Sequence, residues 1–323
     1  MRALITGVAG FIGSNLAESL IATPGVSVVG VDSFTDYYGA DLKQRNLDAI
    51  GGGAFEFRRA DVRSLSVEEI QEFDAIFHLA AQPGVRASWG RTFADYVSAN
   101  IEATQWLLEA SKGSSRLQRF VYSSSSSVYG DAERFPTVET DMPRPFSPYG
   151  VTKLAAEHMC GLYARNFGVP TVSLRYFTVY GPRQRPDMAF TRFVRAAVEG
   201  TPIHIYGDGH QTRDFTFVDD IVRANVTAAR AEVRPGSVYN VAGGSNVSVR
   251  EVLALIEEMS QKDLLVEYQP SVAGDVRVTR GSTSLIESDL GWKAEVDLRE
   301  GLERHYGWAV DQWGVDVTPA TSL

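Results

Sequence analysis

The residue types best suited to chemistry lie between positions 123 and 153. A run of five serines, Ser123 to Ser127, precedes Tyr149 and Lys153, which stand four residues apart. Residues at that spacing share one face of a helix. A lysine ammonium beside a tyrosine favours the phenolate and lowers the pKa of the phenol. Tyr149 is therefore a candidate general base near neutral pH.

A glycine turn near the N-terminus indicates what is brought to this tyrosine. Gly7, Gly10 and Gly13 follow a short apolar strand over 2–6 and open a helix expected over about 14–22. Glycine permits a tight turn and a close approach of the backbone to a pyrophosphate, which a helix N-terminus then stabilises. The order of strand, glycine turn and helix predicts a dinucleotide site.

The second apolar strand, over 26–31, supplies the acidic residue that such a site requires. It ends at Asp32, where a carboxylate can accept hydrogen bonds from an adenosine ribose. No arginine adjoins Asp32 in the sequence, and the carboxylate would repel the 2′-phosphate of NADP. We therefore expect NAD.

The positioning elements alternate between strands and helices, which predicts an α/β protein with a doubly wound parallel sheet of the Rossmann kind. Further strands are expected over 54–60, 75–79, 119–122 and 172–176, and helices over 36–48, 92–111 and 149–167. Ligands of such sheets bind at the carboxyl ends of the strands, so the motifs that follow these strands should converge on one edge.

Beyond Gly181 the pattern loosens, and we expect a smaller, interleaved C-terminal α/β domain that holds the substrate. A strand over 237–241 should rejoin the main sheet. The expected cofactor domain is 1–176 plus about 215–245, and the expected substrate domain is about 177–214 plus 246–316.

The composition restricts the possible partners. The net charge of −9 argues against a nucleic-acid surface. No apolar run is long enough for a membrane span, and no signal pattern opens the chain, so a cytoplasmic enzyme is expected. No metal is expected, because the histidines are scattered and lack partners at metal-ligand spacing.

The combination of Gly7-x-x-Gly10-x-x-Gly13, Asp32, Ser125 and Tyr149-x-x-x-Lys153 resembles the extended short-chain dehydrogenase/reductase family. Within that family it is similar to the sugar-nucleotide epimerases and dehydratases. The resemblance implies that Tyr149 is the acid/base and that Ser125 hydrogen-bonds the reacting hydroxyl. It also implies that Lys153 holds the nicotinamide ribose and lowers the pKa of the tyrosine.

The resemblance also implies a set of cofactor-binding residues. These are Gly7, Gly10, Phe11, Ile12, Gly13, Asp32, Asp61, Val62, Leu79, Ala80, Ala81, Gln82, Asn100, Ser123, Tyr149, Lys153 and Tyr176. Asp61 and Val62 would meet the adenine. Asn100 has an alternative interpretation, as a satisfied buried amide within a helix.

Ser126 and Ser127 bear on the outcome of the reaction. The 4,6-dehydratases carry an Asp-Glu pair at these positions, and two serines cannot supply a carboxylic acid and its base. Four-epimerisation needs only Tyr149 and NAD. On glucuronate, oxidation at C4 creates a β-keto acid, which decarboxylates when its C5–C6 bond aligns with the carbonyl π system. Short hydroxyl donors at Ser126, Ser127 and Thr178 could hold the carboxylate so that this alignment does not occur. The alternative is that the serine run is a tight turn in which only Ser125 is functional.

Two stretches resemble the UDP-glucuronate 4-epimerases in particular. They are Asp36-Tyr37-Tyr38, and Phe177 to Pro182 followed by Arg185-Pro186-Asp187-Met188-Ala189. The region Gly274-Asp275-Val276 also fits, but relatives usually place a phosphate-binding arginine just before this glycine. Arg213 could replace it. The expected substrate-binding residues are Ser126, Ser127, Thr178, Arg185, Arg213, Arg86, Arg192, Asp187 and Met188.

The alternatives fall into several classes. The arginines could form a solvated surface, although bidentate guanidinium groups suit the phosphates of a UDP-sugar. UDP-glucose 4-epimerase is the nearest other isomerase, and a UDP-glucuronate decarboxylase is the lyase alternative. A nucleotide-sensing module is disfavoured because Tyr149 and Lys153 are both present. The family resemblance also suggests a homodimer formed through helices 92–111 and 149–167.

Overall fold

The core of the protein is a sheet of seven parallel strands. The computed structural model describes residues 1–270 and 276–313. In spatial order the strands are β10, β6, β5, β4, β1, β2 and β3. Their bounds are β1 Arg2–Thr6, β2 Ser27–Asp32, β3 Phe55–Arg59, β4 Ala75–His78, β5 Arg119–Ser125, β6 Thr171–Tyr176 and β10 Ser237–Val241. Every neighbouring pair is parallel, so all carboxyl ends lie along one edge.

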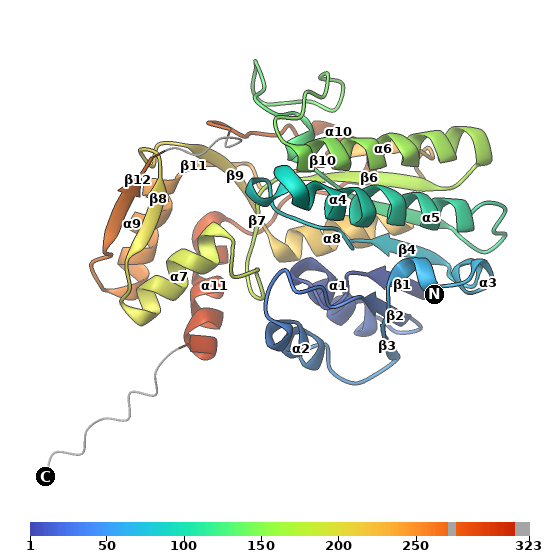
Figure 1. Cartoon of the computed structure of the whole chain (residues 1–323), viewed down its shortest axis with the longest axis horizontal. Helices are drawn as coiled ribbons and strands as arrows, with labels where there is room; N and C mark the ends of the chain where they lie inside the picture. The colour runs from blue at the N-terminus through green and yellow to red at the C-terminus, as the bar shows by residue number, and fades with distance from the viewer. Residues whose placement is uncertain (271–275, 314–323) are drawn as a thin grey trace, which may run out of the picture.

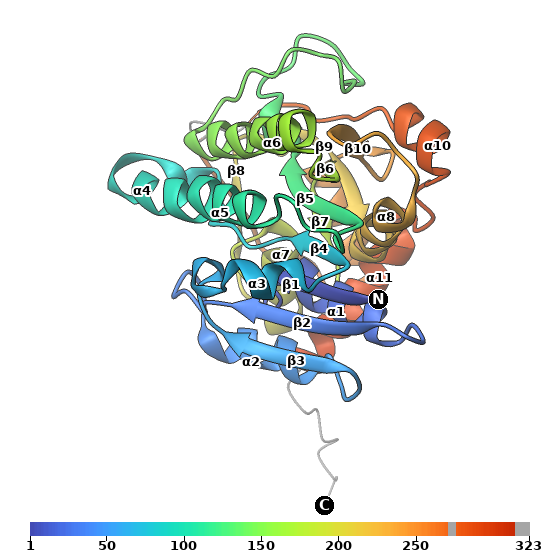
Figure 2. The same ribbon diagram turned by 90° about the vertical axis from the view of Figure 1, so that its right-hand side faces the viewer.

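Helices cover both faces of this sheet (Figure 2). One face carries α1 (Phe11–Ile21), α2 (Ala40–Asp48) and α8 (Val218–Arg230), and the other carries α3 (Val67–Gln71), α5 (Ala103–Ala110) and α6 (Pro148–Phe167). Alternation along β1 shows how the sequence produces two cores. Ala3 and Ile5 pack with Leu16 of α1, whereas Leu4 packs with Leu107 of α5. Because both faces are buried, the strands are apolar almost throughout.

A smaller part of the chain lies beyond the end of the large sheet (Figure 1). Its three-stranded sheet has the order β11 (Ser245–Ser248), β9 (Thr212–Phe217), β7 (Val179–Tyr180), and its two-stranded sheet pairs β12 (Val266–Gln269) with β8 (Ile203–Tyr206). The accompanying helices are α7 (Ala189–Glu199), α9 (Val249–Ser260), α10 (Ser284–Leu290) and α11 (Leu298–Trp313). Within the described residues, no helix is long and apolar enough to cross a membrane.

The large sheet and its helices confirm the predicted α/β architecture. Strand β10 pairs with β6, as expected for a segment that rejoins the main sheet. Helix α6 begins after Ser147, whose hydroxyl accepts from the amide of Gly150, and it ends at Gly168 in the left-handed conformation. The elements around Tyr149 are therefore set by local signals that the sequence carries.

Several predicted bounds differ from the structure. Helix α2 begins at Ala40 rather than at 36. Helix α1 begins at Phe11 rather than near Ser14, because Gly10 is its extended N-cap. Strand β5 continues to Ser125, because its ladder with β6 extends to the Ser125–Tyr176 pair. The helix predicted over 92–111 is confirmed as a continuous run over 93–110, but a π-helical segment, Val97–Glu102, lies within it between α4 (Phe93–Tyr96) and α5.

Candidate active site

The glycine turn packs tightly against the end of a neighbouring strand. Gly7 has φ 72°, and a Cβ there would lie 2.8 Å from the amide nitrogen of Ala80, which follows β4. A Cβ on Gly13 would overlap the carbonyl oxygen of Gly7. The N-cap Gly10 supplies no side chain to the first turn of α1, which also lacks acidic residues. The backbone amides of this turn can therefore receive a pyrophosphate, so the turn fits the expected dinucleotide.

Asp32 is held beside the same turn. Its carboxylate accepts from the amides of Ala9 (3.2 Å) and Phe34 (2.8 Å). The sequence argument that no arginine adjoins Asp32 is incomplete, because Arg59 is its register partner on β3. The Arg59 guanidinium lies 4.8 Å from the centre of the Phe34 ring. The position of the carboxylate fits the ribose role expected of it.

Tyr149 and Ser125 meet at the end of β5. Tyr149 is half-buried and hydrogen-bonded to the hydroxyl of Ser125. Burial raises the pKa of Tyr149, while the charge of Arg185 and the bond from Ser125 act to lower it. The ring of Tyr96 packs edge-on against that of Tyr149, with centroids 6.3 Å apart. A half-buried phenol that is hydrogen-bonded to a serine and lies near a cation can serve as a general acid and base.

Lys153 is held at the end of β5. Its ammonium donates to the carbonyl oxygen of Ser123 at 2.6 Å and lies 5.0 Å from the centre of the Tyr122 ring. Burial lowers the pKa of Lys153 to about 7. The expectation that Lys153 lowers the pKa of Tyr149 stays a prediction. The charge of Arg185, in a distant part of the sequence, acts to lower that pKa.

The other serines form a turn stabilised by Ser125. Its side chain caps a single 3₁₀ turn, Ser126–Val128, by accepting from the amide of Ser127 at 3.1 Å. Ser126 and Ser127 are half-buried, as is Thr178 at the end of β6. The turn packs against helix α6 at Gly150, where a Cβ would lie 2.6 Å from the carbonyl oxygen of Ser127.

Arg185 lies within a small polar cluster. Its Nε and Nη2 each donate to a carboxylate oxygen of Asp187 at 2.9 Å. The hydroxyl of Tyr37 donates to Asp187 at 3.3 Å, and the Tyr37 ring lies 5.8 Å from the guanidinium. The stretches 36–38 and 185–189, which both resemble the UDP-glucuronate 4-epimerases, are thus in contact.

The remaining predicted substrate residues lie on the smaller part of the chain or face it. The Arg86 guanidinium stacks over the ring of Tyr206, 4.3 Å from its centre. Arg213 Nη1 donates to the carbonyl oxygens of Thr212 and Arg277. Met188 is the N-cap of α7, and Arg192 is half-buried in the following turn. Gly274 and Asp275 lie outside the described residues.

The other predicted cofactor residues have defined surroundings. Asp61 caps a 3₁₀ turn (Val62–Ser64) and pairs with Arg63, and hydrogen bonding from Arg63 lowers its pKa. Val62 is buried. Asn100 has all its amide groups satisfied, as the alternative interpretation required, and two of its bonds hold the backbone of Gln82.

A buried ion pair contacts the residues on either side of the serine turn. Sequence reasoning did not find this pair. Arg175 on β6 makes a bidentate pair with Glu157 on α6. Glu157 also accepts from the hydroxyl of Ser124 at 2.6 Å, and Arg175 donates to the hydroxyl of Tyr129 at 2.7 Å. The two charged residues lie on separate elements, so no spacing in the sequence indicates their contact.

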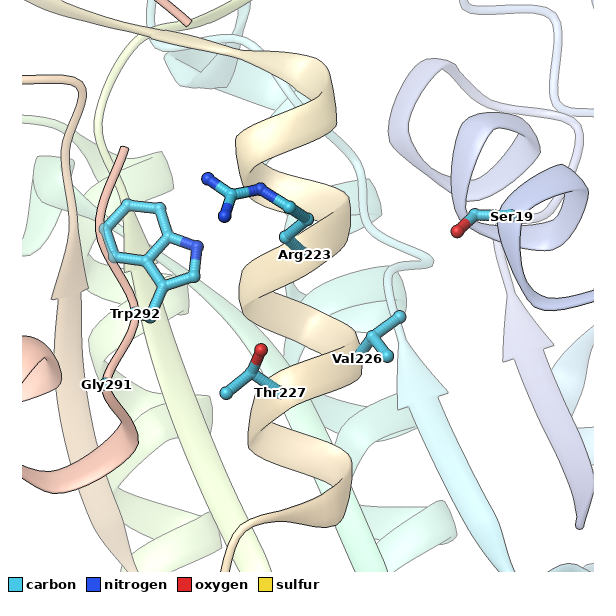
Figure 3. Close-up of a pocket in the computed structure, with 6 residues that line it drawn as sticks. All are labelled: Ser19, Arg223, Val226, Thr227, Gly291 and Trp292. Carbon is cyan, nitrogen blue, oxygen red and sulfur yellow. The ribbon is translucent and has the colours of Figure 1, made fainter. Parts of the chain in front are cut away.

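A separate surface hollow lies between α1 and α8 (Figure 3). It is lined by Ser19, Arg223, Val226, Thr227, Gly291 and Trp292. Arg223 is engaged by the carboxylates of Asp220 and Glu295. The hollow contains none of the predicted site residues and is not part of the candidate active site.

The parallel sheet, the glycine turn and the hydrogen-bonded serine–tyrosine pair fit a dinucleotide-dependent enzyme. Residues 3–242 match the NAD dependent epimerase/dehydratase family, and the chain belongs to this family. Among its relatives is an uncharacterized UDP-glucose epimerase of Bacillus subtilis (strain 168), 40% identical, with 94% of this chain and 96% of the relative covered. A UDP-glucuronate 4-epimerase of Thermodesulfobacterium geofontis is 37% identical, with 95% of both chains covered.

Solved structures include a UDP-glucuronic acid 4-epimerase from Bacillus cereus in complex with UDP-glucuronic acid and NAD. The two structures superpose with a TM-score of 0.92 at 42% identity, over 97% of this chain and 100% of the other. The match extends over both the large sheet and the smaller C-terminal part.

Proposed function

We propose that the protein is an NAD-dependent 4-epimerase of UDP-sugars, acting on UDP-glucuronate to give UDP-galacturonate. The observation that carries the proposal is the hydrogen bond between Ser125 and Tyr149, within reach of the charge of Arg185 and beside a turn that has serines where dehydratases have acids. The similarity to a UDP-glucuronic acid 4-epimerase over nearly the whole chain supports it.

Tyr149 removes the proton of the 4-hydroxyl and later returns it. The hydroxyl of Ser125 bonds both this phenol and the reacting oxygen, so the proton crosses a short, dry path. Arg185 holds down the pKa that burial raises, and so favours the phenolate form needed at the first step. Bound NAD supplies a transient oxidation at C4 that is reversed on the other face of the ring, so the reaction is redox-neutral.

The serine turn restrains the substrate while C4 is a ketone. Ser126 and Ser127 project hydroxyls from one 3₁₀ turn, and Thr178 lies at the adjacent strand end. Hydrogen bonds from these hydroxyls to the carboxylate keep the C5–C6 bond near the ring plane, where decarboxylation is slow. Arg185 adds a charge-assisted bond. Arg86, Arg192 and Arg213 bind the diphosphate on the side of the smaller sheets, where Asp187 and Met188 complete the pocket.

The cofactor lies along the other strand ends. The pyrophosphate binds to the turn from Gly7 to Gly13, and the adenosine ribose binds to Asp32. Lys153 holds the nicotinamide ribose from its place beside Ser123. The residues at the ends of β3, β4, β5 and β6 line the rest of the site.

The test is to incubate the purified protein separately with UDP-glucuronate and UDP-glucose and to identify the products by NMR. UDP-galacturonate without release of carbon dioxide is the expected product, and UDP-xylose or a 4-keto pentose would refute the proposal. Conversion of UDP-glucose alone would favour the second candidate, UDP-glucose 4-epimerase, which the name of the Bacillus subtilis relative suggests.

Two tyrosine variants test the role of the base. Tyr149→Phe should retain NAD and lose turnover by at least about a hundredfold, since general acid–base catalysis contributes about 10²–10⁴. Tyr96→Phe is the matched control, because its hydroxyl donates to the carbonyl oxygens of Pro83 and Gly84. Retained activity in Tyr149→Phe would remove this residue as the base.

The helices α4, α5 and α6 form the face through which we expect a homodimer (Figure 2). Val151, Leu162 and Phe167 are large apolar residues exposed on α6, and Trp89 and Phe93 are exposed at the start of α4. Light scattering should give twice the 35.4 kDa of one chain, and a Leu162→Asp/Phe167→Asp variant should give a monomer. Leu285→Asp, on α10, is the control.

We place the protein in the cytoplasm, where UDP-sugars are made. In the proposed division, the large sheet with β10 binds the cofactor, and the segments carrying β7, β8, β11 and β12 bind the UDP-sugar. Limited proteolysis with and without UDP-glucuronate would test that division, since ligand should protect the smaller part.

A further inference from the structure

His78, at the end of β4, is bonded at both ring nitrogens and has no place in the proposed chemistry. Its Nδ1 lies 2.8 Å from the hydroxyl of Thr6, its register partner on β1. Its Nε2 lies 2.9 Å from the hydroxyl of Thr104 on α5. All three side chains are 0% exposed.

The directions of these hydrogen bonds follow from counting protons. Thr104 Oγ1 donates its single hydrogen to the carbonyl oxygen of Asn100 at 2.7 Å, so it must accept from His78. The proton of the imidazole is therefore on Nε2, and Nδ1 accepts from the hydroxyl of Thr6. That hydroxyl oxygen accepts in turn from the amide of Ala80 at 3.1 Å. Burial, followed by the charge of Lys153, lowers the pKa of His78 to about 3, so the ring is neutral at physiological pH.

These hydrogen bonds form a chain through His78, and both ends of the chain reach the candidate active site. At one end, Ala80 is the residue whose backbone touches Gly7. At the other, Asn100 lies in the π-helical segment, where its side chain holds the backbone of Gln82 and donates to Thr152. The hydroxyl of Thr152 donates to the carbonyl oxygen of Tyr149 at 2.8 Å.

We propose that His78, as the neutral Nε2–H tautomer, is a positioning residue. It aligns the segment Ala80–Gln82, which follows β4, with the start of helix α6, which carries Tyr149. The inference rests on the proposed function, because it assigns the segment after β4 to the NAD site. Imidazole suits the position since it carries an acceptor and a donor on opposite edges of one rigid ring. No other side chain presents both groups in that geometry.

The first test is Thr104→Val, which keeps shape but leaves the Nε2–H of His78 without an acceptor and frees the carbonyl of Asn100. An unsatisfied buried donor is costly, and we expect NAD to bind about tenfold more weakly, with kcat lowered by a similar factor. The dissociation constant is measured by calorimetry on NAD-free protein. The KM for the sugar should stay within about twofold.

Thr171→Val is the matched control. Thr171 is also 0% exposed and donates one hydrogen bond, to the carbonyl oxygen of Cys160, but at the opposite end of the sheet. It should lower the melting temperature about as much as Thr104→Val does and leave NAD affinity unchanged. Equal NAD affinity in Thr104→Val and the wild type would overturn the inference, and would show that Thr104 only stabilises the fold.

Substitutions of His78 separate the effect of its hydrogen bond to Thr6 from the effect of its hydrogen bond to Thr104. His78→Asn can still accept from Thr6, and His78→Gln can still donate to Thr104, so each should weaken NAD binding less than His78→Phe. Equal affinities in all three folded variants would also overturn the inference. A wild type that binds NAD but converts no UDP-sugar would refute the proposed function alone, because NAD affinity still reports on His78.

Discussion

The buried pair of Arg175 and Glu157 predicts a large and non-additive loss of stability. Both side chains are 4% exposed. Two hydrogen bonds join them, Nη2 to Oε1 at 2.6 Å and Nε to Oε2 at 3.0 Å. In Arg175→Met the carboxylate of Glu157 keeps only the hydroxyl of Ser124 among the described residues, and Tyr129 loses its donor.

Removing one partner of a buried pair costs about 3–5 kcal/mol, because it leaves a charge buried without compensation. For a chain of this size that loss lowers the melting temperature by about 2 °C per kcal/mol, or about 6–10 °C in all. The double variant Arg175→Met/Glu157→Leu has no orphaned charge. It should lose less than Arg175→Met alone, so the coupling free energy should exceed about 3 kcal/mol.

Urea unfolding followed by circular dichroism and by tryptophan fluorescence measures these free energies, and coincidence of the two transitions supports a two-state treatment. Single effects that add in the double variant would refute the reasoning, as would a loss below about 1 kcal/mol for Arg175→Met. Since Glu157 lies one turn beyond Lys153 on α6, the single variants should also lower kcat.

Three further predictions concern the site itself. Arg185→Gln should raise the pKa of Tyr149 and move the acidic limb of the kcat/KM profile upward by about one pH unit, because the nearby cation is lost. In NAD-free protein, stability should rise with pH above 7 by up to ~1.4 kcal/mol per unit, since folded Lys153 has lost the proton that the unfolded lysine still holds; urea unfolding of Lys153→Met should show no such slope. Gly13→Ala should weaken NAD binding at least about tenfold in calorimetry, because its methyl group would overlap the carbonyl oxygen of Gly7.

Each of these has a control elsewhere in the chain. Arg299→Gln removes an exposed arginine paired with Glu258 and should leave the pH profile unshifted. Lys112→Met removes a half-buried lysine that pairs with Glu109, far from the site, and should keep the stability slope. Gly307→Ala adds a methyl group on α11 with nothing within 4 Å. An unshifted profile in Arg185→Gln, a retained slope in Lys153→Met, or unaltered NAD affinity in Gly13→Ala would contradict the corresponding argument.

The parts of the fold that sequence reasoning predicted well depend on local signals. Helix α6 has nearly the bounds predicted for it, 149–167, because Ser147 caps its start and Gly168 ends it. The glycine turn and Asp32 were found because strand, turn and helix follow one another within a short segment. The prediction that the strand ends converge rested on one general rule, that the carboxyl ends of parallel strands lie at one edge of the sheet. The structure agrees with this prediction.

The parts that failed depend on contacts between distant segments. The π-helical segment cannot be read from apolar spacing, because its extra residue is matched by the bonds of Asn100 to Gln82 and Thr152. The strand pair β8–β12 joins segments some sixty residues apart. Tertiary packing brings these two segments together, and no local propensity in either segment predicts that they pair.

The sequence of this protein was enough to determine the cofactor turn, the acid after the second strand and a tyrosine on a capped helix, because each is a short pattern with its own physical cause. Tertiary structure alone decided the electrostatics of that tyrosine. Burial raises its pKa, and the charge of Arg185 acts to lower it from a distant part of the sequence. Charge and desolvation depend on distances through space, and Lys153, although only one helical turn away, points its ammonium to the carbonyl of Ser123.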